Sequence, residues 1–578
     1  MATLKLIQFS GEIPRLLPRL LPDTAAQRAE NVRLDDGGLT PIRKPRLDHV
    51  VAGVSPIETI YKHGSEWLAW DTVVHAAPGP VAQDRLYYTG DGVPKMRVGT
   101  TVYPLAMNPP TVALTATLGG AGAGDIITRL YVYTEVTDFG EESEPCPISN
   151  EVNWQPGNTV TLSGFRTPPV GRNITKQRIY RSQSSVLSGT DLFLIAERAA
   201  SNSNYVDSIG VDDFAEALPS RDWNPPPDTL QGLIALQNGM MAAFVGKDLY
   251  FCEPYRPHAW PENYVLTLDY PIVALGAFGT TLVVMTTGQP YIVTGTAPEN
   301  MQQERLELNL PCINARGVVD LGYSVAYPSH DGLVVVNSGG ASVATGQLMT
   351  RNDWLKTSPA TFVASQFSGR YFASYEYLEA DGTSSTGTFI FDLAGGTPFV
   401  MRSSLKADAC FYDVPNSALY MLFGTEIYEF DALGQVNEIM TWHSKQFVLP
   451  APSTFGAILI EGADELTPEE QAAIADQIAA IEAENAAIFA QTSIGGELNG
   501  GALNVYPMNG DHLLPMPEET FISVSVYADG VLLATISEIN TVKRIPPKRA
   551  RNWEVQVNGT TPIGQISMAT TARELNGI

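Results

Sequence analysis

Short runs of hydrophobic and aromatic residues, separated by turn residues, dominate the chain from about residue 55 onward. The first runs are residues 57–61, 67–70 and 85–88, and Asp91-Gly92 follows them as a turn signal. Runs of about four to eight such residues, bounded by glycine, proline, asparagine or aspartate, are typical of β-strands. The pattern therefore predicts a mainly β protein.

Between about residues 228 and 450 this pattern repeats. Each repeat has one apolar run, a turn, and a second run with an aromatic or β-branched centre. The second runs are residues 248–251, 290–293, 333–336, 388–391 and 427–430. Their centres are 41, 43, 57 and 37 residues apart when taken at Tyr250, Tyr291, Val334, Phe391 and Tyr428. A period of about 40–50 residues is typical of four-stranded β-propeller blades.

The repeat sets the expected architecture. We expect propeller blades in residues 223–457, a first blade region in residues 55–110, and C-terminal strands that close the propeller in residues 519–578. A polar insertion around residues 381–385 accounts for the longest interval. Sheets stacked as a double sandwich are the alternative architecture.

Two proline clusters bracket a separate segment. Asn108-Pro109-Pro110 precedes it and Asn224 with Pro225, Pro226 and Pro227 follows it. Proline pairs stiffen a linker and interrupt strand pairing. Residues 111–222 contain six or seven strand-like runs, such as 127–134 and 192–196. This length and strand number predict one immunoglobulin or fibronectin III-like sandwich inserted into the propeller.

The N-terminal region, residues 1–54, has a different character. Its first 50 residues hold eight Lys or Arg and six Asp or Glu, although the whole chain is strongly acidic. Asp23 is a suitable N-cap for a short helix over residues 24–31, and Asp36-Gly37 is a turn that would end it. We expect an N-terminal arm that packs on another element.

An acidic segment follows the repeats. Residues 446–542 contain 14 Asp or Glu and no Lys or Arg in 97 residues. Thr467, Pro468, Glu469 and Glu470 form a capping box with proline at the first helical position, which predicts a helix to about residue 491. Residues 458–518 are thus expected to form an acidic helical insertion. Its larger apolar residues, with Asn485, follow a coiled-coil-like spacing and are candidate subunit-interface residues: Ile474, Ile478, Ile481 and Ile488.

A basic run comes directly after the acidic segment. Five positive charges fall within nine residues and are further candidates for a subunit interface: Lys543, Arg544, Lys548, Arg549 and Arg551. The acidic helix supplies candidates for an acidic channel or surface: Glu469, Glu470, Asp476, Glu482 and Glu484. These carboxylates are explained either as a solvated helix surface or as a wall that repels phosphates, so that DNA slides past. The basic run could pair with an acidic surface of a neighbouring copy.

Composition excludes several classes of function. The 578 residues carry a formal net charge of −26, whereas a nucleic-acid binder held by phosphate contacts needs the opposite balance. Charged residues make up 17%, below the usual value of about 25%. No run approaches 18 uninterrupted apolar residues, and residues 1–10 lack the apolar region of a secretory signal. We therefore expect neither a membrane span nor secretion by that route.

The sequence contains no convincing pattern of catalytic, phosphate-binding or metal-binding residues. The four cysteines are far apart, and no two of the seven histidines have metal-ligand spacing. The glycine-rich run at 118–125 leads into a strand instead of a helix, so it lacks a helix N-terminus for phosphate. Residues 329–332 resemble a degraded sialidase turn, but a hairpin turn explains them. We expect no cofactor, no metal site and no catalytic residue.

Several segments nevertheless resemble proteins of phage tails. Gly-Glu-Ile-Pro-Arg at 11–15 and Leu-Pro-Asp at 21–23 resemble the N-terminal arm of tail-tube proteins. Tyr-Val-Tyr-Thr at 131–134 and Arg-Ile-Tyr-Arg at 178–181 resemble a fibronectin-type insertion of virion proteins, together with residues 140–143 and 205–207. Blade-like segments are found at 251–254, 257–261 and 328–333, and a similar ending at 553–559.

Together these segments resemble the tail nozzle of short-tailed phages, the tail tubular protein B-like family. The resemblance implies a homohexamer at the lower end of a virion tail, made in the host cytoplasm. Propellers would surround a channel that retains the genome and conducts DNA during ejection. A portal or adaptor ring would bind above, and fibre, spike or tail-tip proteins below. The resemblance implies no catalytic residue, and the region 458–518 departs from the family's pattern.

Two other functions stay open on the sequence alone. One is a glycan-binding or glycan-cleaving propeller used for host attachment, because paired carboxylates can hydrolyse sugar bonds. The other is a trimeric tail-tip hub of a long-tailed phage, which would share the arm and the sandwich. Polysaccharide binding would favour the first, and three copies instead of six would favour the second.

Overall fold

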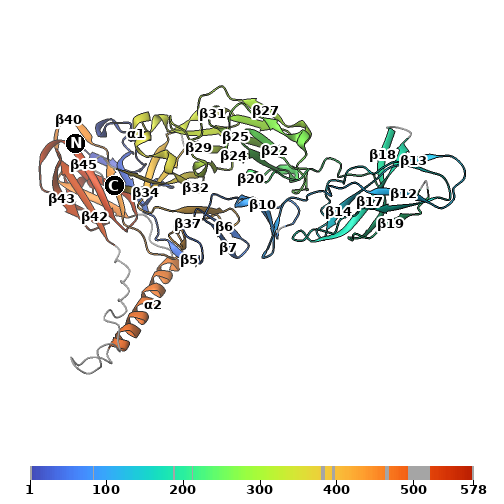
Figure 1. The fold of residues 1–578 in the computed structure, drawn as a ribbon. Coiled ribbons are helices and arrows are strands. Elements are labelled where there is room, and N and C mark those ends of the chain that lie inside the picture. Colours follow the sequence, from blue (N-terminus) through green and yellow to red (C-terminus); the bar gives the residue numbers. More distant parts are fainter. Residues whose placement is uncertain are drawn as a thin grey trace. The chain divides into compact units, whose positions relative to one another are not determined.

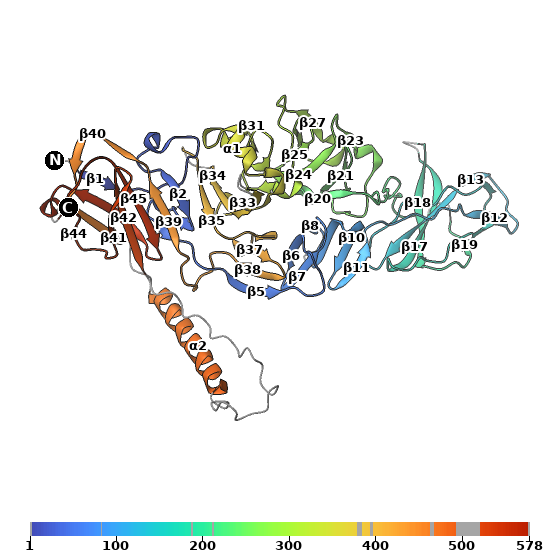
Figure 2. The same ribbon diagram turned by 60° about the vertical axis from the view of Figure 1, so that its left-hand side comes forward.

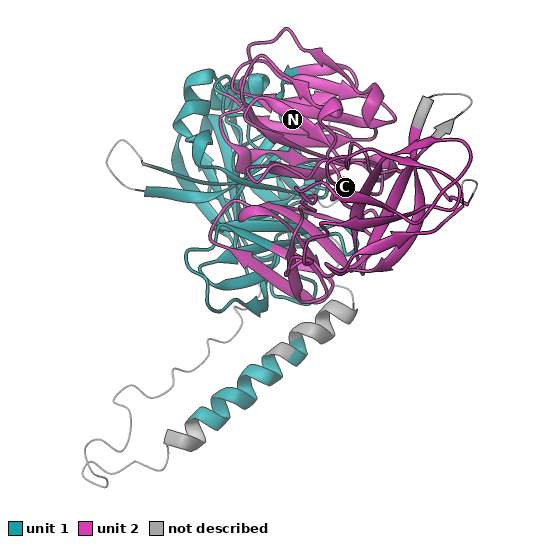
Figure 3. Cartoon of the chain, turned by 45° about the vertical axis from the view of Figure 1, so that its right-hand side comes forward, with its two compact units in different colours: residues 1–60, 330–334, 342–578 teal, residues 61–329, 335–341 magenta. Residues whose placement is uncertain are grey.

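The computed structural model describes residues 3–82, 84–185, 189–210, 213–378, 384–393, 397–462, 468–492 and 521–575 (Figure 1). The described chain is mainly β, as predicted, and most of its sheets are antiparallel. It divides into two compact units (Figure 3). Unit 1 comprises Met1–Ile60, His330–Val334 and Ser342–Ile578, and unit 2 comprises Tyr61–Ser329 and Val335–Ala341.

Unit 2 contains consecutive four-stranded antiparallel sheets in which strands follow one another in chain order. The first is β8 (His75–Pro78), β9 (Arg85–Gly90), β10 (Gly92–Val98) and β11 (Thr101–Pro104). The second is β20 (Gln231–Ala235), β21 (Met241–Val245), β22 (Asp248–Phe251) and β23 (Leu266–Thr267). The third is β24 (Ile272–Phe278), β25 (Thr281–Thr286), β26 (Tyr291–Thr294) and β27 (Gln302–Arg305).

Three further four-stranded segments continue the series. One is β28 (Val319–Asp320), β29 (Val325–Pro328), β30 (Leu333–Asn337) and β31 (Gly340–Val343). In unit 1 the next is β32 (Val363–Phe367), β33 (Arg370–Leu378), β34 (Ser384–Asp392) and β35 (Phe399–Ser403). The last is β36 (Ala409–Asp413), β37 (Ala418–Phe423) and β38 (Glu426–Glu429), completed by the N-terminal strand β5 (Arg46–Val50), beside β38 in Figure 2.

The predicted repeat is confirmed at the level of strands. Each predicted second run coincides with the third strand of one four-stranded segment: β22, β26, β30, β34 and β38. Tight turns join these strands, and Gly246, between β21 and β22, has a φ of +61°. A residue with a side chain is strained in that conformation, which glycine adopts freely.

Further strands of unit 1 extend the sheet of β32–β35 to ten strands. After β35 it runs through β2 (Ala26–Glu30), β39 (Met440–Ser444), β45 (Arg549–Gly559), β42 (Ile522–Ala528) and β43 (Val531–Ile536), with β40 (Phe447–Thr454) also paired to β45. Burial alternates strictly along β42, where serine and tyrosine face out, so one face of the sheet covers the core. Trp442 and Trp553 are fully buried in that core.

Shorter elements complete both units. A further sheet has the order β1 (Thr3–Leu6), β46 (Ile563–Ala569), β41 (Ala457–Gly462) and β44 (Lys543–Arg544), and β3 (Val32–Arg33) pairs β4 (Thr40–Pro41). The hairpin β6 (Thr59–His63) and β7 (Glu66–Trp70) forms a two-stranded sheet. The α-helices are α1 (Arg351–Lys356), α2 (Pro468–Thr492) and α3 (Ala572–Leu575). The 3-10 helices are Pro18–Leu20, Gln237–Gly239, Glu262–Tyr264, Pro298–Asn300, Ala315–Gly317, Ala344–Gln347 and Pro359–Thr361.

The helix predicted over residues 24–31 is wrong. These residues form β2, which pairs antiparallel with β39 and, at Glu30, parallel with β35. Its partners lie about 400 residues away in the chain, so tertiary pairing overrides the local capping signal of Asp23. The arm packs within its own unit, because Phe9 meets Trp442 edge-on with ring centroids 4.9 Å apart.

Eight strands between β11 and β20 form an inserted β domain, comprising β12–β19. They are β12 (Thr115–Gly119), β13 (Ile127–Arg129), β14 (Tyr131–Thr137), β15 (Val152–Trp154), β16 (Thr159–Ser163), β17 (Ile174–Ser185), β18 (Gly189–Ala199) and β19 (Tyr205–Asp207). Their sheet orders are β12-β16-β19, β13-β15 and β14-β17-β18. One hydrophobic core, extending from Leu114 to Leu218, joins all three sheets.

Helix α2 is confirmed as predicted. It begins at Pro468, the residue that the capping-box pattern places first, and ends at Thr492, one residue beyond the predicted end. Part of the predicted acidic insertion at 458–518 lies outside the described residues, as do residues 381–383 of the polar insertion. Residues 458–462 of that region belong to strand β41 instead of the helical part.

Candidate interaction surfaces

A buried polar junction holds the inserted β domain to the adjoining chain of unit 2. Arg172 and Glu141 form an ion pair with 2.8 Å between Nη1 and Oε2, and both side chains are buried. Arg172 also donates through Nη2 to the carbonyl of Leu105, 3.2 Å away. Asn173 donates its amide to the hydroxyl of Tyr103, at 3.0 Å. The hydrogen bonds to Leu105 and Tyr103 attach the domain to β11 and the residue that follows it, whereas the ion pair with Glu141 lies within the domain and holds Arg172 in place.

His258 provides a second attachment, from the loop after β22. Its Nε2 lies 3.1 Å from the carbonyl oxygen of Glu142, and Trp223 packs edge-on against the ring at 5.9 Å. Burial lowers the pKa of His258 to about 4, so the imidazole is neutral at pH 7. Because a carbonyl can only accept, Nε2 carries the proton.

Asn224 anchors the second proline-containing linker. Its amide donates to Oε2 of Glu144 at 3.3 Å, and its side-chain oxygen accepts the N–H of Glu262 at 3.2 Å. Its backbone carbonyl accepts the N–H of Trp260 at 2.8 Å. The linker is therefore bound on both sides, by the inserted domain and by the loop after β22.

Inside the domain, charged groups are buried in pairs. Asp207 accepts hydrogen bonds from Arg181 at 3.1 Å, from Arg129 at 3.4 Å and from the hydroxyl of Tyr131 at 2.8 Å. The Arg129 guanidinium also stacks 3.6 Å from the centroid of the Trp154 ring. Every member of this cluster is buried. Such a network stabilises a shape and exposes no reactive group.

Residues 141–149 cover the free edge of β14. Three residues spaced by three, Ser143, Cys146 and Ser149, each donate a backbone N–H to a carbonyl of β14. Each also accepts an N–H of β14 on its side-chain oxygen or sulfur. A spacing of three, with Pro145 and Pro147 between, fits an extended polyproline-like segment. It protects an edge strand that could otherwise pair with another chain.

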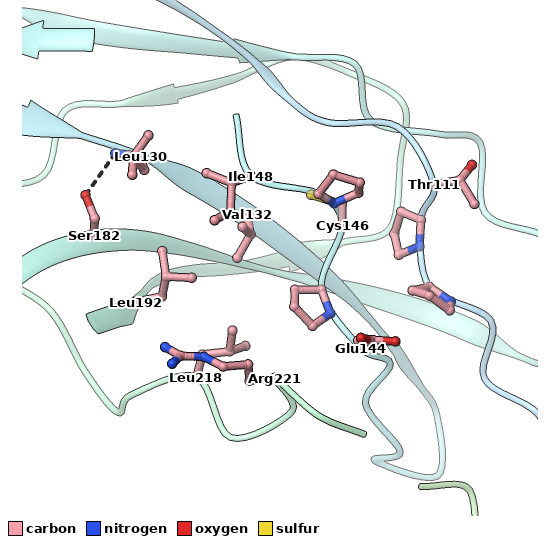
Figure 4. A pocket seen from close by; sticks show the side chains of 14 residues that line it. Thr111, Leu130, Val132, Glu144, Cys146, Ile148, Ser182, Leu192, Leu218 and Arg221 are labelled. Atoms are coloured by element: carbon pink, nitrogen blue, oxygen red, sulfur yellow. Dashed lines mark hydrogen bonds between the residues drawn. The ribbon is translucent and has the colours of Figure 1, made fainter. Parts of the chain in front are cut away.

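This segment forms one wall of a groove of about 820 Å³ (Figure 4). The other wall is the first linker, at residues 109–111. Apolar side chains from β14 and the residue before it, from β18 and from the end of the domain line the space between them: Leu130, Val132, Leu192 and Leu218. Glu144 and Arg221 are the charged residues among those that line it. The volume lies within the range of clefts that hold organic ligands, about 300–1,000 Å³.

The groove is suited to binding and offers no activated nucleophile. Burial raises the pKa of the Cys146 thiol to about 11, so the thiol stays protonated and unreactive at pH 7. The Ser182 hydroxyl accepts the N–H of Leu130 at 2.9 Å, the dashed line in Figure 4. Burial raises the pKa of Glu144 as well. The sequence analysis missed this groove, although the Pro145 and Pro147 pair was its visible signal.

The five basic candidates lie on β44, on β45 and between them: Lys543, Arg544, Lys548, Arg549 and Arg551. Lys543 pairs with Glu538 at 2.5 Å, and Lys548 donates to the carbonyl of Ala528 at 2.9 Å. Arg549 and Arg551 donate through Nε to the carbonyls of Pro452 and Leu449, at 3.3 and 3.1 Å. The side chains of Arg544, Arg549 and Arg551 are exposed.

The acidic and apolar candidates lie on α2. Ile478, Ile481 and Ile488 are half-buried, whereas Asp476, Glu482 and Glu484 are exposed. The side chains of the remaining candidates, Ile474, Glu469 and Glu470, lie outside the described residues. Whether either group lies at a subunit interface stays a prediction.

The described residues contain no group of three or more His, Cys, Asp or Glu that could hold a metal ion. Within the same residues, no helix has both the length and the apolar character needed to cross a bilayer.

Comparisons with known proteins add little. No protein-family model and no curated protein matches the chain. Among solved structures, the N-terminal domain of Nup159 matches with a TM-score of 0.23 and 8% identity, over 46% of this chain and 70% of its own. PorZ of Porphyromonas gingivalis gives 0.21 and 11%, over 66% and 43%. The extracellular domain of BT4673 from B. thetaiotaomicron gives 0.20 and 7%, over 93% and 81%. Scores this low carry no argument about function.

Proposed function

We propose that the chain is a structural virion protein, the tail nozzle that forms the distal part of a phage tail channel. In this proposal it assembles as a homohexamer, retains the genome before infection and conducts DNA during ejection. The observation that carries the proposal is the series of four-stranded antiparallel segments with one inserted β domain. This is the arrangement that the resemblance to the tail tubular protein B-like family implies.

The proposal treats the four-stranded segments as blades of a β-propeller. Within unit 2, β20 lies against β8 and β9, and β24 contacts both β20 and β28. Within unit 1, β32 contacts β36. First strands packed against first strands are expected where blades share a central axis. Completion of the β36–β38 sheet by the N-terminal β5 supports the same proposal, since propellers often close with a strand from the other end of the chain.

The inserted β domain is proposed to be an immunoglobulin or fibronectin III-like module. Its eight strands and single core are compatible with such a sandwich. Arg172, which is paired with Glu141 inside the module, also donates to the carbonyl of Leu105 outside it, and this contact attaches the module to the end of β11. In this proposal the groove and the rest of the module contact other virion proteins, such as fibres or spikes.

Electrostatics supports passage of DNA instead of binding. The net charge of −26 repels phosphates, so a channel lined by this chain would not hold the polyanion. The described groove offers no activated nucleophile, which agrees with a mechanical role. Opening of the channel after receptor contact would then release the genome.

The test is the copy number and position of the chain in virions. Native mass spectrometry of the purified protein, alone and with the portal and adaptor ring, is expected to show six copies. Immunogold labelling of intact particles is expected at the distal end of a short tail. Three copies would support the trimeric hub instead. Monomers that bind polysaccharide, with no signal in denatured virions, would overturn the proposal in favour of a glycan-binding propeller.

A further inference from the structure

We propose that helix α2 of one copy docks on a second copy. The contact is made by the isoleucine row of α2, which includes Ile478 and Ile481, and by an apolar and basic surface at the end of the ten-stranded sheet. The inference rests on the proposed function, because it assigns a contact within the proposed ring. The contact would join one face of α2 in one copy to one end of the sheet in the other.

The helix carries an apolar row with acidic sides. Ile478 and Ile481 are half-buried, whereas the neighbouring Glu482 and Glu484 are exposed. At 3.6 residues per turn, Glu482 and Glu484 fall about 80° to either side of the row, and Asp476 falls opposite it. A helix with this pattern fits an apolar surface that has positive charge on its sides.

The acceptor surface has positive charge that is held in place. Arg549 and Arg551 donate through Nε to the carbonyls of Pro452 and Leu449, in the bulge of β40 opposite β45. No described residue accepts a hydrogen bond from the terminal Nη nitrogens of these two arginines. Each guanidinium can therefore present its terminal donors to a carboxylate, the group that arginine pairs with most strongly.

Exposed apolar side chains lie close to these arginines. Asp529, in the turn from β42 to β43, accepts the N–H groups of Arg551 and Asn552 at 3.2 and 2.9 Å. These hydrogen bonds place the turn beside the arginines of β45. Val531 and Leu532 follow that turn and are 57% and 52% exposed. Val448, which pairs with Asn552, is 46% exposed. Exposed apolar residues grouped with arginine are typical of protein contacts.

Charge complementarity selects a second copy as the occupant. Residues 446–542 hold 14 acidic groups and no basic one, whereas residues 543–551 hold five basic groups. The two surfaces differ from each other, so the contact is head-to-tail, and repeated head-to-tail contacts generate a closed ring when the rotation closes. The carboxylates of Asp529 and Glu538 are already occupied, by backbone N–H groups and by Lys543.

Charge reversal tests the docking. Glu482→Arg with Glu484→Arg, and separately Arg549→Glu with Arg551→Glu, should each raise the dissociation constant of the assembly about tenfold or more at low salt. Combining the four substitutions should restore assembly. Asp476→Arg is the matched control on the opposite face of α2 and should leave assembly unchanged. Sedimentation velocity measures assembly, and circular dichroism checks that each variant is folded.

Crosslinking tests which copy is the partner. Ala483→Cys with Leu532→Cys, oxidised in the full-length protein, should give a ladder of covalent multimers on a non-reducing gel. Crosslinked monomers alone would overturn the second copy as the occupant. Reversal variants that assemble like the unsubstituted protein would overturn the docking and leave the hexamer intact. An unsubstituted protein that forms no hexamer would contradict the proposed function itself.

Discussion

The inserted β domain and helix α2 both interrupt series of strands, yet they carry charge in opposite ways. The domain lies between β11 and β20, and several of its charged groups are buried together, such as Asp207 with Arg181. Helix α2 lies between β41 and β42, and its carboxylates Asp476, Glu482 and Glu484 are exposed. The buried charges of the domain therefore interact with residues of the same fold, whereas the exposed carboxylates of α2 are accessible to groups outside it.

This difference distinguishes charged residues that stabilise the fold from charged residues that are available for contacts with other molecules. A buried charge without its partner is costly, so each buried pair constrains the domain and its attachment. An exposed carboxylate costs little to change and contributes little to stability. Substitutions in the domain should therefore change unfolding, whereas substitutions on α2 should change only association.

The largest effect is expected for Asp207→Asn. The substitution removes the negative charge that Arg129 and Arg181 share, and it leaves two buried guanidinium groups without compensation. We expect a loss of about 3–5 kcal/mol in the free energy of unfolding. Urea unfolding followed by tryptophan fluorescence measures it, since Trp154 lies in the same cluster. A loss below about 1 kcal/mol would contradict the structural role of this cluster.

The next effect concerns pH and His258. Its pKa is about 4 in the folded protein and near its ordinary value of 6.5 in the unfolded chain. Between these values the unfolded chain binds the extra proton, so stability falls as the pH drops from 6.5 to 4. The loss should reach about 3 kcal/mol near pH 4. His258→Gln, which keeps a donor for Glu142, should remove this part of the pH dependence in urea unfolding at successive pH values.

Three charged groups near His258 affect the outcome. Glu141 favours the protonated ring, whereas Arg172 and Arg256 oppose it. The comparison must therefore be made at equal ionic strength. An unchanged pH profile in His258→Gln would show that other titrating groups dominate the acid response.

A smaller effect is expected for Asn224→Ala at the second linker. The substitution removes the hydrogen bonds to Glu144 and to the N–H of Glu262. We expect a loss of about 1 kcal/mol, because neither partner is deeply buried. Because residues 225–227 are prolines and have no amide hydrogen, the amides to follow are those of Trp260 and Glu262, which should exchange faster in the variant than in the unsubstituted protein. Equal protection in both proteins would show that Trp260 alone holds the linker.

The smallest effect is expected for the exposed carboxylates of α2. Glu482→Gln and Asp476→Asn should each change the free energy of unfolding by less than about 0.5 kcal/mol. Thermal unfolding checks this expectation. A larger loss from Glu482→Gln than from Asp476→Asn would indicate that the acidic side of the isoleucine row already has a partner within its own copy.

Local signals account for what could be predicted. The third strands of five segments were found from apolar runs and turns, because the strand period and the turn residues are local. Helix α2 was located to within one residue at its end, since proline at the first turn and a capping box are local too. The charged candidates on α2 and over residues 543–551 follow from charge alone and the isoleucine candidates from their spacing, and the role of both sets stays a prediction.

Long-range pairing could not be predicted. Residues 26–30 became a strand because β39 and β35 offered partners about 400 residues away, and β5 completed the sheet of β36–β38 for the same reason. The groove formed because residues 141–149 replaced an edge strand beside β14. The pairings of β2 and β5 have no signal within a short window of sequence, whereas the segment at 141–149 has one in Pro145 and Pro147.

The positions of the repeated strands, helix α2 and the separation of acidic from basic charge follow from the sequence alone, because each depends on residues that are near one another in the chain. Tertiary structure decided which charges are buried in pairs, such as Arg172 with Glu141, and which remain exposed, such as Arg551. The physical reason is desolvation: a charge enters the interior only where a distant residue compensates it, and that residue is known only from the folded chain.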